Sequence, residues 1–457
     1  MQVALFFVKL WALLIVIEVI MGSYANHIST VQSRFDEALQ ATGFDSVLIY
    51  SGQSQIAFLD DNPYPFRVNP LFKYWLPVTE SPKSFIFYKA GCKPVVYLYK
   101  AKDFWHAPVN IAPAEWQDHM ELKVVDNLAQ VRSDVGDELT KTAYLGEQFE
   151  PMTSWQLGQV NPKALIDHLH YQRSEKTEWE LENLRKANDL AAQAHVAARD
   201  AFYAGASEIE IQHAYLSAIN FREQEVPYNS IIALNEHSAI LHYDVYDRSA
   251  PSESRSFLID AGALYNGYCA DITRTYAAQK SGFYQELVEA MDKAEQAIIE
   301  AIRPGVSYYD LHVRMHHMVA TILVDFGFFK ISPEEVYERG YTNAFFPHGL
   351  GHYIGLQVHD VGGFLKSAQG DAYERDGRHP FLRLLRNVEP GQVFTIEPGL
   401  YVVDQLLEEF DGNDDFNWAR IAELRPYGGV RIEDSVHVTN DGVENITRDA
   451  FAKVSKF

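Results

Sequence analysis

The sequence has little cysteine and a deficit of positive charge. Cys92 and Cys269 are the only cysteines among its 457 residues. Two cysteines cannot build a disulfide framework or a thiolate metal site, and they fit a reducing compartment. Lysine and arginine total 39 against 62 aspartates and glutamates, which gives a formal net charge of −23. Nucleic acids and anionic membranes both require basic patches, so this balance argues against either as a partner.

One long apolar run stands at the N-terminus, over residues 3–20. Lys9 and Glu18 interrupt it, no basic segment precedes it, and no small-residue cleavage site follows it. These features do not match a secretory signal. The sequence from Met21 onward is ordinary, so we expect residues 1–21 to be a misassigned start and the protein to be cytoplasmic. The open alternative is that residues 1–20 anchor the chain in a membrane or export it.

The remaining chain has the composition of a globular protein, with 47% hydrophobic and 22% charged residues. Residues 28–42 place apolar side chains at helical spacing. Short apolar runs predict strands at 46–50, 84–88, 94–99 and 141–145. This mixture predicts an N-terminal α/β domain over residues 22–172, in which we find no catalytic cluster.

A long helix predicted over residues 173–202 marks a boundary, and one element then occurs twice. Gly205-Ala-Ser-Glu-Ile-Glu210 resembles Gly305-Val-Ser-Tyr-Tyr-Asp310 further along the chain. Each segment has a glycine where a helix ends and a Ser-x-x-acid box where the next helix begins. The second domain, residues 173–457, is therefore expected to contain a duplicated αβ unit.

Histidine and glycine alternate in the stretch from Pro347 to Asp360, P-H-G-L-G-H-Y-I-G-L-Q-V-H-D. Each glycine inside a helix costs roughly 1 kcal/mol relative to alanine, so a helical metal motif is disfavoured. We expect a glycine-rich turn that leads into a strand over residues 353–359. Three histidines so close together, His348, His352 and His359, point to a metal or substrate site rather than to isolated buried imidazoles.

Acidic residues interrupt several apolar strand segments. If Asn266-Gly267 forms a two-residue hairpin loop, Asp260 pairs with Thr273 and lies diagonal to Asp271. Such neighbours repel each other at neutral pH unless a cation lies between them.

Glu397 and Glu433 create the same problem in T-I-E-P-G and V-R-I-E-D. Mostly oxygen ligands with one imidazole favour manganese-like ions. Two cations about 3.5–4 Å apart can hold a bridging water, lower its pKa and polarise a carbonyl or phosphoryl oxygen.

These blocks carry a resemblance to a known family. H-G-L-G-H-Y-I-G-L-Q-V-H-D, F-L-I-D-A-G, A-D-I-T-R-T, T-I-E-P-G-L-Y and G-G-V-R-I-E-D-S-V resemble, in order, the proline dipeptidase and aminopeptidase P branch of the pita-bread metallopeptidases. The C-terminal blocks resemble bacterial proline dipeptidases (Xaa-Pro dipeptidases) related to organophosphorus acid anhydrolases. The resemblance implies an α/β N-terminal domain followed by an α+β pita-bread (creatinase/aminopeptidase-like) catalytic domain with an internal pseudo-twofold repeat.

The resemblance also implies a dinuclear site with two divalent cations per subunit, manganese being expected. Asp260 would bind one cation, Asp271 and Glu433 would bridge both, and His352 and Glu397 would complete the second. The implied catalytic and substrate-handling residues are His348, Glu397, His359, Arg431, His242 and Tyr228, with Glu397 also moving a proton and Tyr228 in the pocket wall.

The implied activity is hydrolysis of Xaa-Pro dipeptides by a metal-bridged hydroxide, with organophosphorus triesters as a side activity. An Xaa-Pro bond has no N–H, and metal polarisation of the carbonyl avoids the need for that donor. The implied assembly is a homodimer or higher oligomer, with a neighbour's loop near Asp61 closing the pocket. Two alternatives stay open: an aminopeptidase P acting on longer peptides, and a pita-bread module kept only for binding a protein.

Overall fold

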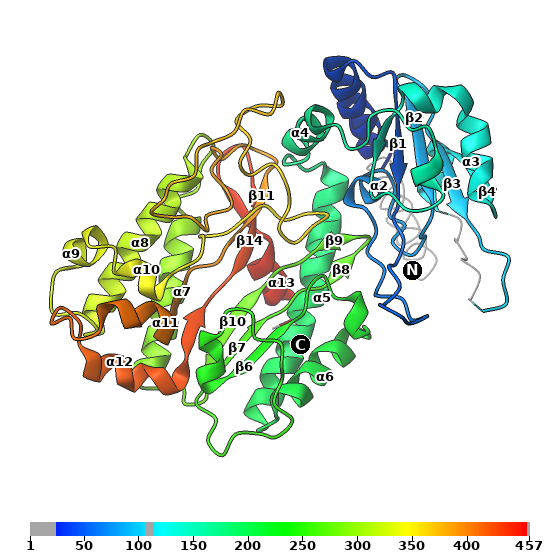
Figure 1. Ribbon diagram of the computed structural model, residues 1–457. Helices are drawn as coiled ribbons and strands as arrows, with labels where there is room; N and C mark the ends of the chain where they lie inside the picture. Colours follow the sequence, from blue (N-terminus) through cyan, green and yellow to red (C-terminus); the bar gives the residue numbers. More distant parts are fainter. Residues whose placement is uncertain (1–23, 106–113, 455–457) are drawn as a thin grey trace, which may run out of the picture. The chain divides into compact units, whose positions relative to one another are not determined.

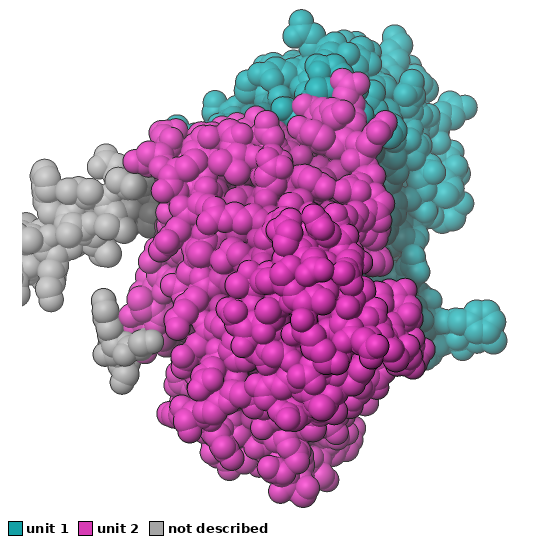
Figure 2. All heavy atoms as spheres, turned by 90° about the vertical axis from the view of Figure 1, so that its left-hand side faces the viewer, with its two compact units in different colours: residues 1–173, 177–181, 367–370 teal, residues 174–176, 182–366, 371–457 magenta. Residues whose placement is uncertain are grey.

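The structure, a computed structural model, describes residues 24–105 and 114–454. The chain divides into two compact units, which Figure 2 colours separately. Unit 1 comprises residues 1–173, 177–181 and 367–370, and unit 2 comprises residues 174–176, 182–366 and 371–457. The expected extension, residues 1–21, lies outside the described residues. Among the residues that are described, no helix combines the length and apolar character needed to cross a membrane.

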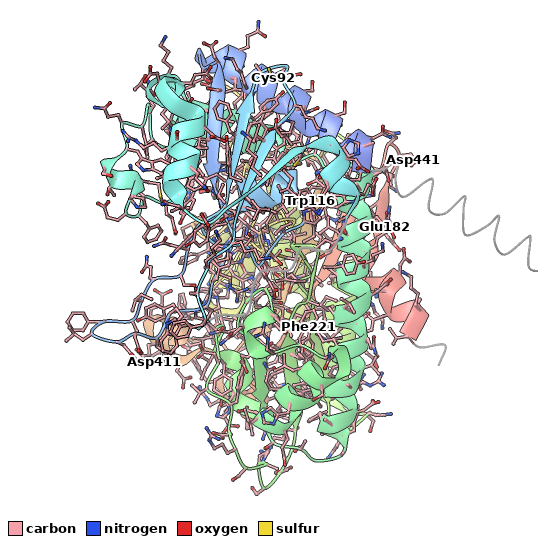
Figure 3. The ribbon with its side chains drawn as sticks, turned by 90° about the vertical axis from the view of Figure 1, so that its right-hand side faces the viewer. Cys92, Trp116, Glu182, Phe221, Asp411 and Asp441 are labelled. Atoms are coloured by element: carbon pink, nitrogen blue, oxygen red, sulfur yellow. The ribbon has the colours of Figure 1, made fainter. Side chains whose placement is uncertain are left out.

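Unit 1 is built on a mixed sheet with the strand order β4-β3-β2-β1-β5 (Figure 1). β1 pairs antiparallel with β2 and parallel with β5, while β3 pairs antiparallel with β2 and parallel with β4. The four predicted strands are confirmed as β1, β2, β3 and β5, because their apolar runs are long enough for a buried strand. The elements are a helix over residues 24–42, β1 (Ser46–Tyr50), α2 (Pro70–Trp75), β2 (Phe85–Lys89), β3 (Val95–Tyr99), β4 (Glu121–Val125), α3 (Leu128–Val135), β5 (Ala143–Leu145) and α4 (Lys163–Gln172). Cys92 is exposed in this unit (Figure 3), Cys269 of unit 2 is buried, and the two are not joined in a disulfide.

The first half of unit 2 packs two helices on the sheet β10-β7-β6 (Figure 1). The elements are α5 (Glu178–Tyr203), α6 (Glu208–Ile219), β6 (Ile231–Leu234), β7 (Ser256–Asp260), β8 (Leu264–Tyr265), β9 (Tyr268–Cys269) and β10 (Thr273–Ala277). Ala187, Ala191, Ala194 and Ala198 form a stripe of helical spacing on α5, where their small side chains let the helix lie close to the sheet. α5 begins at Glu178 and not at residue 173 as expected, because the Thr177 hydroxyl accepts a hydrogen bond from the Glu180 N–H.

The second half of unit 2 repeats this plan with two helices beside the sheet β11-β14-β15 and the ribbon β12-β13. The main elements are α7 (Phe283–Ile299), α8 (Tyr308–Asp325), α9 (Pro333–Glu338), α10 (Thr342–Phe345), β11 (Val393–Ile396), β12 (Gly399–Tyr401), α11 (Asp404–Leu407), α12 (Trp418–Leu424), β13 (Gly429–Arg431), β14 (Asp434–Val438), β15 (Val443–Asn445) and α13 (Ile446–Val454). Gly205 and Gly305 have φ angles of 84° and 91°, and each directly precedes a helix that starts after a serine. The predicted serine N-cap occurs twice: Ser207 and Glu210 form the full capping box, whereas at Ser307 the hydroxyl accepts from the Asp310 N–H. The predicted glycine at a helix end is confirmed at Gly205, where left-handed backbone favours glycine, but α7 already ends at Ile299, well before Gly305.

The strand expected over residues 353–359 is wrong. Tyr353 forms only an isolated bridge with Phe394, and the chain then folds back so that the Asp360 N–H donates to the Tyr353 carbonyl at 2.8 Å. The fold-back surrounds an ion pair of 2.8 Å between Lys176 and Asp360, whose side chains are each 1% exposed. A Cβ on Gly355 would lie 2.4 Å from the Asp360 carboxylate, so glycine makes room for this buried pair rather than for a pleated strand.

Candidate metal centre

The hairpin around Asn266-Gly267 has the predicted register. Tyr265 pairs with Tyr268 and Asp260 pairs with Thr273, as the two-residue loop requires. Asp271 lies in a short break between β9 and β10.

The Tyr228 hydroxyl holds the two aspartates side by side. It lies 2.7 Å from Asp260 Oδ1 and 2.5 Å from Asp271 Oδ1. Both carboxylates are mostly buried, with side-chain exposures of 15% and 7%. The expected diagonal arrangement of Asp260 and Asp271 is therefore realised as a pair bridged by a phenol.

His352 reaches this pair because residues 350–353 run alongside β11. The Thr395 N–H donates to the His352 carbonyl at 2.9 Å, and the Glu397 N–H donates to the Leu350 carbonyl at 2.8 Å. Any Cβ on Gly351 would lie 2.0 Å from the Thr395 carbonyl oxygen, so the approach requires glycine. His352 Nε2 then lies 3.5 Å from Asp271 Oδ2 and 3.7 Å from Glu397 Oε1.

Glu433 completes the group from the short gap between β13 and β14. Its backbone N–H donates to the Thr273 carbonyl at 3.0 Å, and its Oε2 accepts from the Thr273 hydroxyl at 2.7 Å. One ligand atom from each of Asp271, His352 and Glu433 lies within 4.8 Å of the other two. All five residues predicted as metal ligands are thus gathered around one place, at the ends and breaks of strands rather than within them.

The pKa values show how strongly these carboxylates conflict without a cation. Burial, with the charges of Asp271 and Glu397, raises the pKa of Glu433 well above its ordinary range. Burial raises the pKa of Glu397 to about 7, and burial also raises that of Asp260 against the opposing charge of Arg431. Burial pushes the pKa of Asp271 upward too, but its hydrogen bonds with His352 and Tyr228 and the charge of His352 together outweigh this and leave the pKa lowered. Such a group must take up protons or bind cations, and four oxygen ligands with one imidazole suit divalent cations.

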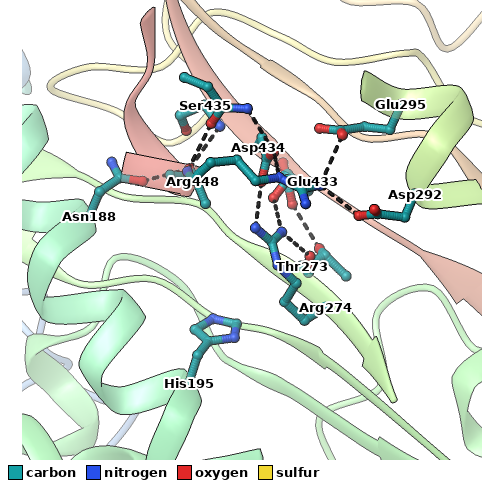
Figure 4. Close-up of polar contacts among 12 residues, drawn as sticks. Asn188, His195, Thr273, Arg274, Asp292, Glu295, Glu433, Asp434, Ser435 and Arg448 are labelled. Atoms are coloured by element: carbon teal, nitrogen blue, oxygen red, sulfur yellow. Dashed lines mark hydrogen bonds and ion pairs between the residues drawn. The ribbon is translucent and has the colours of Figure 1, made fainter. Parts of the chain in front are cut away.

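A second polar network, on the side of the chain opposite the ligand group, fixes the backbone at Glu433 (Figure 4). Arg274 donates to the Glu433 carbonyl at 2.7 Å and to Asp434 Oδ1 at 2.6 Å, and Arg448 donates to Asp434 Oδ2 at 2.5 Å. Arg448 also reaches Asp292 at 2.7 Å. Because side chains alternate along the chain here, Glu433 faces the site while Asp434 faces this network. The fully buried Asp434 carboxylate therefore fixes the backbone that carries Glu433.

Tyr401 links the remaining predicted residues and was not predicted. Its hydroxyl lies 2.9 Å from His348 Nε2 and 2.8 Å from a guanidinium nitrogen of Arg431. Arg431 also donates to Asp260 Oδ2 at 2.9 Å. In this structure the Arg431 guanidinium is thus hydrogen-bonded to two groups of the site, the Tyr401 hydroxyl and the Asp260 carboxylate. The block T-I-E-P-G-L-Y places Tyr401 four residues after Glu397, which was the available signal.

The last two predicted residues lie at the edge of the group. The imidazole of His359 stands edge-on to that of His352, with ring centroids 4.4 Å apart. His242 is exposed, and its charge contributes to lowering the pKa values of His348 and His359, each to about 3 and each chiefly through burial. The structure therefore brings all ten predicted site residues into one neighbourhood.

Comparisons with known proteins agree with this geometry. Residues 182–440 match the model of metallopeptidase family M24, and residues 22–171 match the model of the Xaa-Pro dipeptidase N-terminal domain. The chain is 64% identical to Xaa-Pro dipeptidase 2 of Idiomarina loihiensis over 95% of this chain and 99% of the relative. It is 44% identical to the Xaa-Pro dipeptidase of Shewanella frigidimarina over 93% of this chain and 97% of the relative.

Solved structures share the fold. Aminopeptidase P of E. coli, zinc-substituted and in complex with product, superposes with a TM-score of 0.68 at 22% identity, covering 93% of this chain and 98% of that one. Proline aminopeptidase P II of Yersinia pestis superposes with a TM-score of 0.69 at 22% identity, covering 96% and 100%. These identities are low, so the two structures establish the fold alone.

Replacing the buried Asp434 tests whether this polar network stabilises the fold. Asp434→Asn removes the carboxylate that pairs with Arg274 and Arg448, and should lower the free energy of unfolding by about 3–5 kcal/mol, as loss of one partner of a buried ion pair does. Urea unfolding measures the change. The matched control is Asp200→Asn, which removes an exposed pair with Arg199 and should change stability by less than about 1 kcal/mol. Equal losses in the two variants would contradict the bracing role.

The pKa of Glu397 predicts a pH dependence. Its folded-state value of about 7 lies above the ordinary 4.5, so the metal-free fold is favoured by protonation and loses that stability as pH rises from about 4.5 through about 7. A bound cation replaces the proton, so the gain in melting temperature on adding Mn²⁺ should grow between about pH 5 and about pH 8. Differential scanning calorimetry with and without chelator measures it. Metal-free Glu397→Gln should lose stability less steeply over this range, and an unchanged slope would refute the assignment.

Proposed function

The chain belongs to metallopeptidase family M24, and we propose that it is a metal-dependent Xaa-Pro dipeptidase, cleaving the peptide bond before a C-terminal proline. The observation that carries the proposal is the buried group of four carboxylates and one imidazole, in which every expected ligand is kept. Relatives named Xaa-Pro dipeptidase, at 44% and 64% identity over nearly the whole chain, support the substrate class.

The ligand set fits two divalent cations. Asp260, Asp271, His352, Glu397 and Glu433 would hold them. The crowded carboxylates, whose pKa values rise without a cation, support this fit, and hard oxygen donors favour Mn²⁺. The cations would supply an activated water and polarise the scissile carbonyl.

The chain's own residues would orient the ligands and the substrate. Tyr228 keeps Asp260 and Asp271 together through its hydroxyl. Glu397 is proposed to move a proton between the attacking water and the leaving proline nitrogen, since its Oε2 lies 3.7 Å from His348 Nδ1 at the edge of the ligand group.

The remaining site residues would hold the peptide. His348 would stabilise the tetrahedral intermediate. Burial lowers its pKa to about 3, and the neutral ring donates its one N–H, at Nδ1, to the Gly349 carbonyl at 2.9 Å, so this hydrogen bond would be exchanged for one to the oxyanion when the substrate reacts. His242, His359 and Arg431 would hold the substrate carbonyl and the proline carboxylate. Hydrogen bonds from Arg431 to the Tyr401 hydroxyl and to Asp260 Oδ2 keep its guanidinium oriented toward the site.

We further propose the division into an N-terminal domain at 22–172 and a catalytic domain at 173–457. A homodimer or higher oligomer, in which the N-terminal loop near Asp61 of a neighbouring copy closes the pocket, is part of the same proposal. The low cysteine content, two residues in the whole sequence, supports a cytoplasmic location. Organophosphorus triesters are a proposed side substrate, because their tetrahedral centre resembles the intermediate of peptide hydrolysis.

The test compares a dipeptide with its extended form. With Mn²⁺ present, Ala-Pro should be hydrolysed with a kcat/KM at least about 100-fold above that for Ala-Pro-Ala. The extra alanine would extend past the closed end of a dipeptide pocket, and each misplaced or unpaired group there costs several kcal/mol. Asp271→Asn should reduce kcat by more than about 1,000-fold, because it removes a ligand to both cations.

Two outcomes would favour other functions. A preference for the tripeptide would make the protein an aminopeptidase P. Metal-free protein as purified, together with unchanged function in Asp271→Asn, would favour a binding module. The matched control is Asp244→Asn, an exposed acidic residue outside the ligand group, which should retain full activity.

A further inference from the structure

A second cluster of histidines lies in unit 2, away from the carboxylate group. His312 and His316 stand one turn apart on α8, and His379 projects from the segment before β11. Their exposures are only 1%, 1% and 6%. The three ring centroids are 4.5–4.6 Å from one another, and one nitrogen from each ring lies within 4.8 Å of the other two.

Two nitrogens of this cluster have no hydrogen-bond partner. His312 Nδ1 and His379 Nε2 are buried and unpaired. An unpaired polar atom in the interior costs about 1–3 kcal/mol, so it calls for an explanation. The third ring is oriented from outside, because His316 Nδ1 lies 2.9 Å from the Thr342 hydroxyl and its Nε2 is left for another contact. A hydrogen-bonded outer nitrogen with a free inner one is the arrangement of histidines that bind metals.

Other acidic and histidine groups differ in this respect. Glu208, His237 and Asp247 also lie within ligand distance of each other. There, however, Glu208 accepts hydrogen bonds from the His237 ring, the Tyr243 hydroxyl and the Asp247 N–H at 2.6–2.8 Å. That group is satisfied by its own members and needs no cation. Within the described residues, the cluster on α8 is the group of potential ligands that combines burial with unpaired nitrogens outside the carboxylate site.

The protonation state suits a metal. Burial and the neighbouring imidazoles lower the pKa of His316 to about 2 and that of His312 well below its ordinary value. Burial likewise lowers the pKa of His379, against the charge of Asp376. All three rings are therefore neutral at neutral pH, and a neutral imidazole has the lone pair that a cation requires.

We propose that His312, His316 and His379 bind a zinc ion, with water as the fourth ligand. Three imidazoles without a carboxylate or thiolate favour Zn²⁺ over Mn²⁺, and zinc commonly takes three protein ligands and water. Zn–N bonds of about 2.0–2.1 Å place the nitrogens about 3.3 Å apart, which small rotations of the rings can achieve. The site goes beyond the peptidase function and does not depend on it.

The bound ion would join α8 to the segment that packs against the catalytic stretch. On Gly349 a Cβ would meet Leu382 Cα at 3.0 Å and the Phe381 carbonyl oxygen at 3.1 Å, so the segment after His379 lies directly on the residue next to His348. Phe346 contacts the rings of His316 and His348, with centroids 4.9 Å away in each case. The zinc site is thus placed to hold the His348 region in position.

Metal counting tests the proposal on the full-length protein. Wild-type protein loaded with Zn²⁺ and desalted should retain one more ion per chain than His379→Gln, whatever number the carboxylate group holds. The matched control is His317→Gln, since this histidine lies beside His316 on the same helix, but its side chain is 41% exposed and its ring lies beside that of Tyr337 rather than in the cluster. It should retain as many ions as the wild type. Equal zinc content in wild type and His379→Gln would overturn the proposal.

Cobalt spectroscopy provides a second measurement that separates the two sites. In a host variant with Asp271→Asn and Glu433→Gln, added Co²⁺ should give the intense visible bands of four-coordinate cobalt. Adding His379→Gln should weaken Co²⁺ binding by at least about 100-fold and remove those bands. Bands that persist in that variant would refute the site. Because neither readout measures peptidase activity, failure of the proposed function would leave both outcomes interpretable.

Discussion

The repulsion between buried carboxylates is the constraint on which unit 2 depends. Asp260, Asp271, Glu397 and Glu433 come from separated parts of the chain and lie around one imidazole, where water cannot screen their charges. No folded chain keeps such a group ionised unless cations or protons compensate it. The raised pKa values of Glu397 and Glu433 express this conflict directly. The same repulsion between carboxylates is relieved when divalent cations bind. The free energy that repulsion costs the metal-free fold therefore adds to the affinity for the cations.

The surrounding structure keeps the carboxylates close together against their mutual repulsion. Gly351 lets the backbone of residues 350–353 approach β11, and this approach directs His352 toward Glu397. Asp434, on the opposite side of the chain from Glu433, is fixed by two arginines. Close backbone packing and buried ion pairs both resist displacement, so the ligands remain in place before any cation arrives.

The histidines of unit 2 lie in two different chemical environments. His352 lies among carboxylates, and their negative charge together with its hydrogen bond to Asp271 raises its pKa despite burial. His312, His316 and His379 lie among apolar and imidazole groups, which lower their pKa values. The first environment suits a hard cation shared with oxygen ligands, and the second suits a zinc ion whose protein ligands are all imidazole nitrogens. Selectivity between the two sites would thus follow from ligand type and not from their location.

The sequence by itself determined the features that depend on neighbouring residues. The Asn266-Gly267 turn set the pairing of Asp260 with Thr273, and the serine signals at 207 and 307 set two helix starts. The family blocks pointed to the carboxylates and the imidazole that lie together in the structure. Only the tertiary structure decided what distant residues do together. The strand expected at 353–359 fails because Lys176, far away in the chain, pairs with Asp360 inside the bend. Tyr401 as the link between His348 and Arg431, and His379 beside α8, were equally hidden, because local periodicity carries no information about which side chains meet across a core.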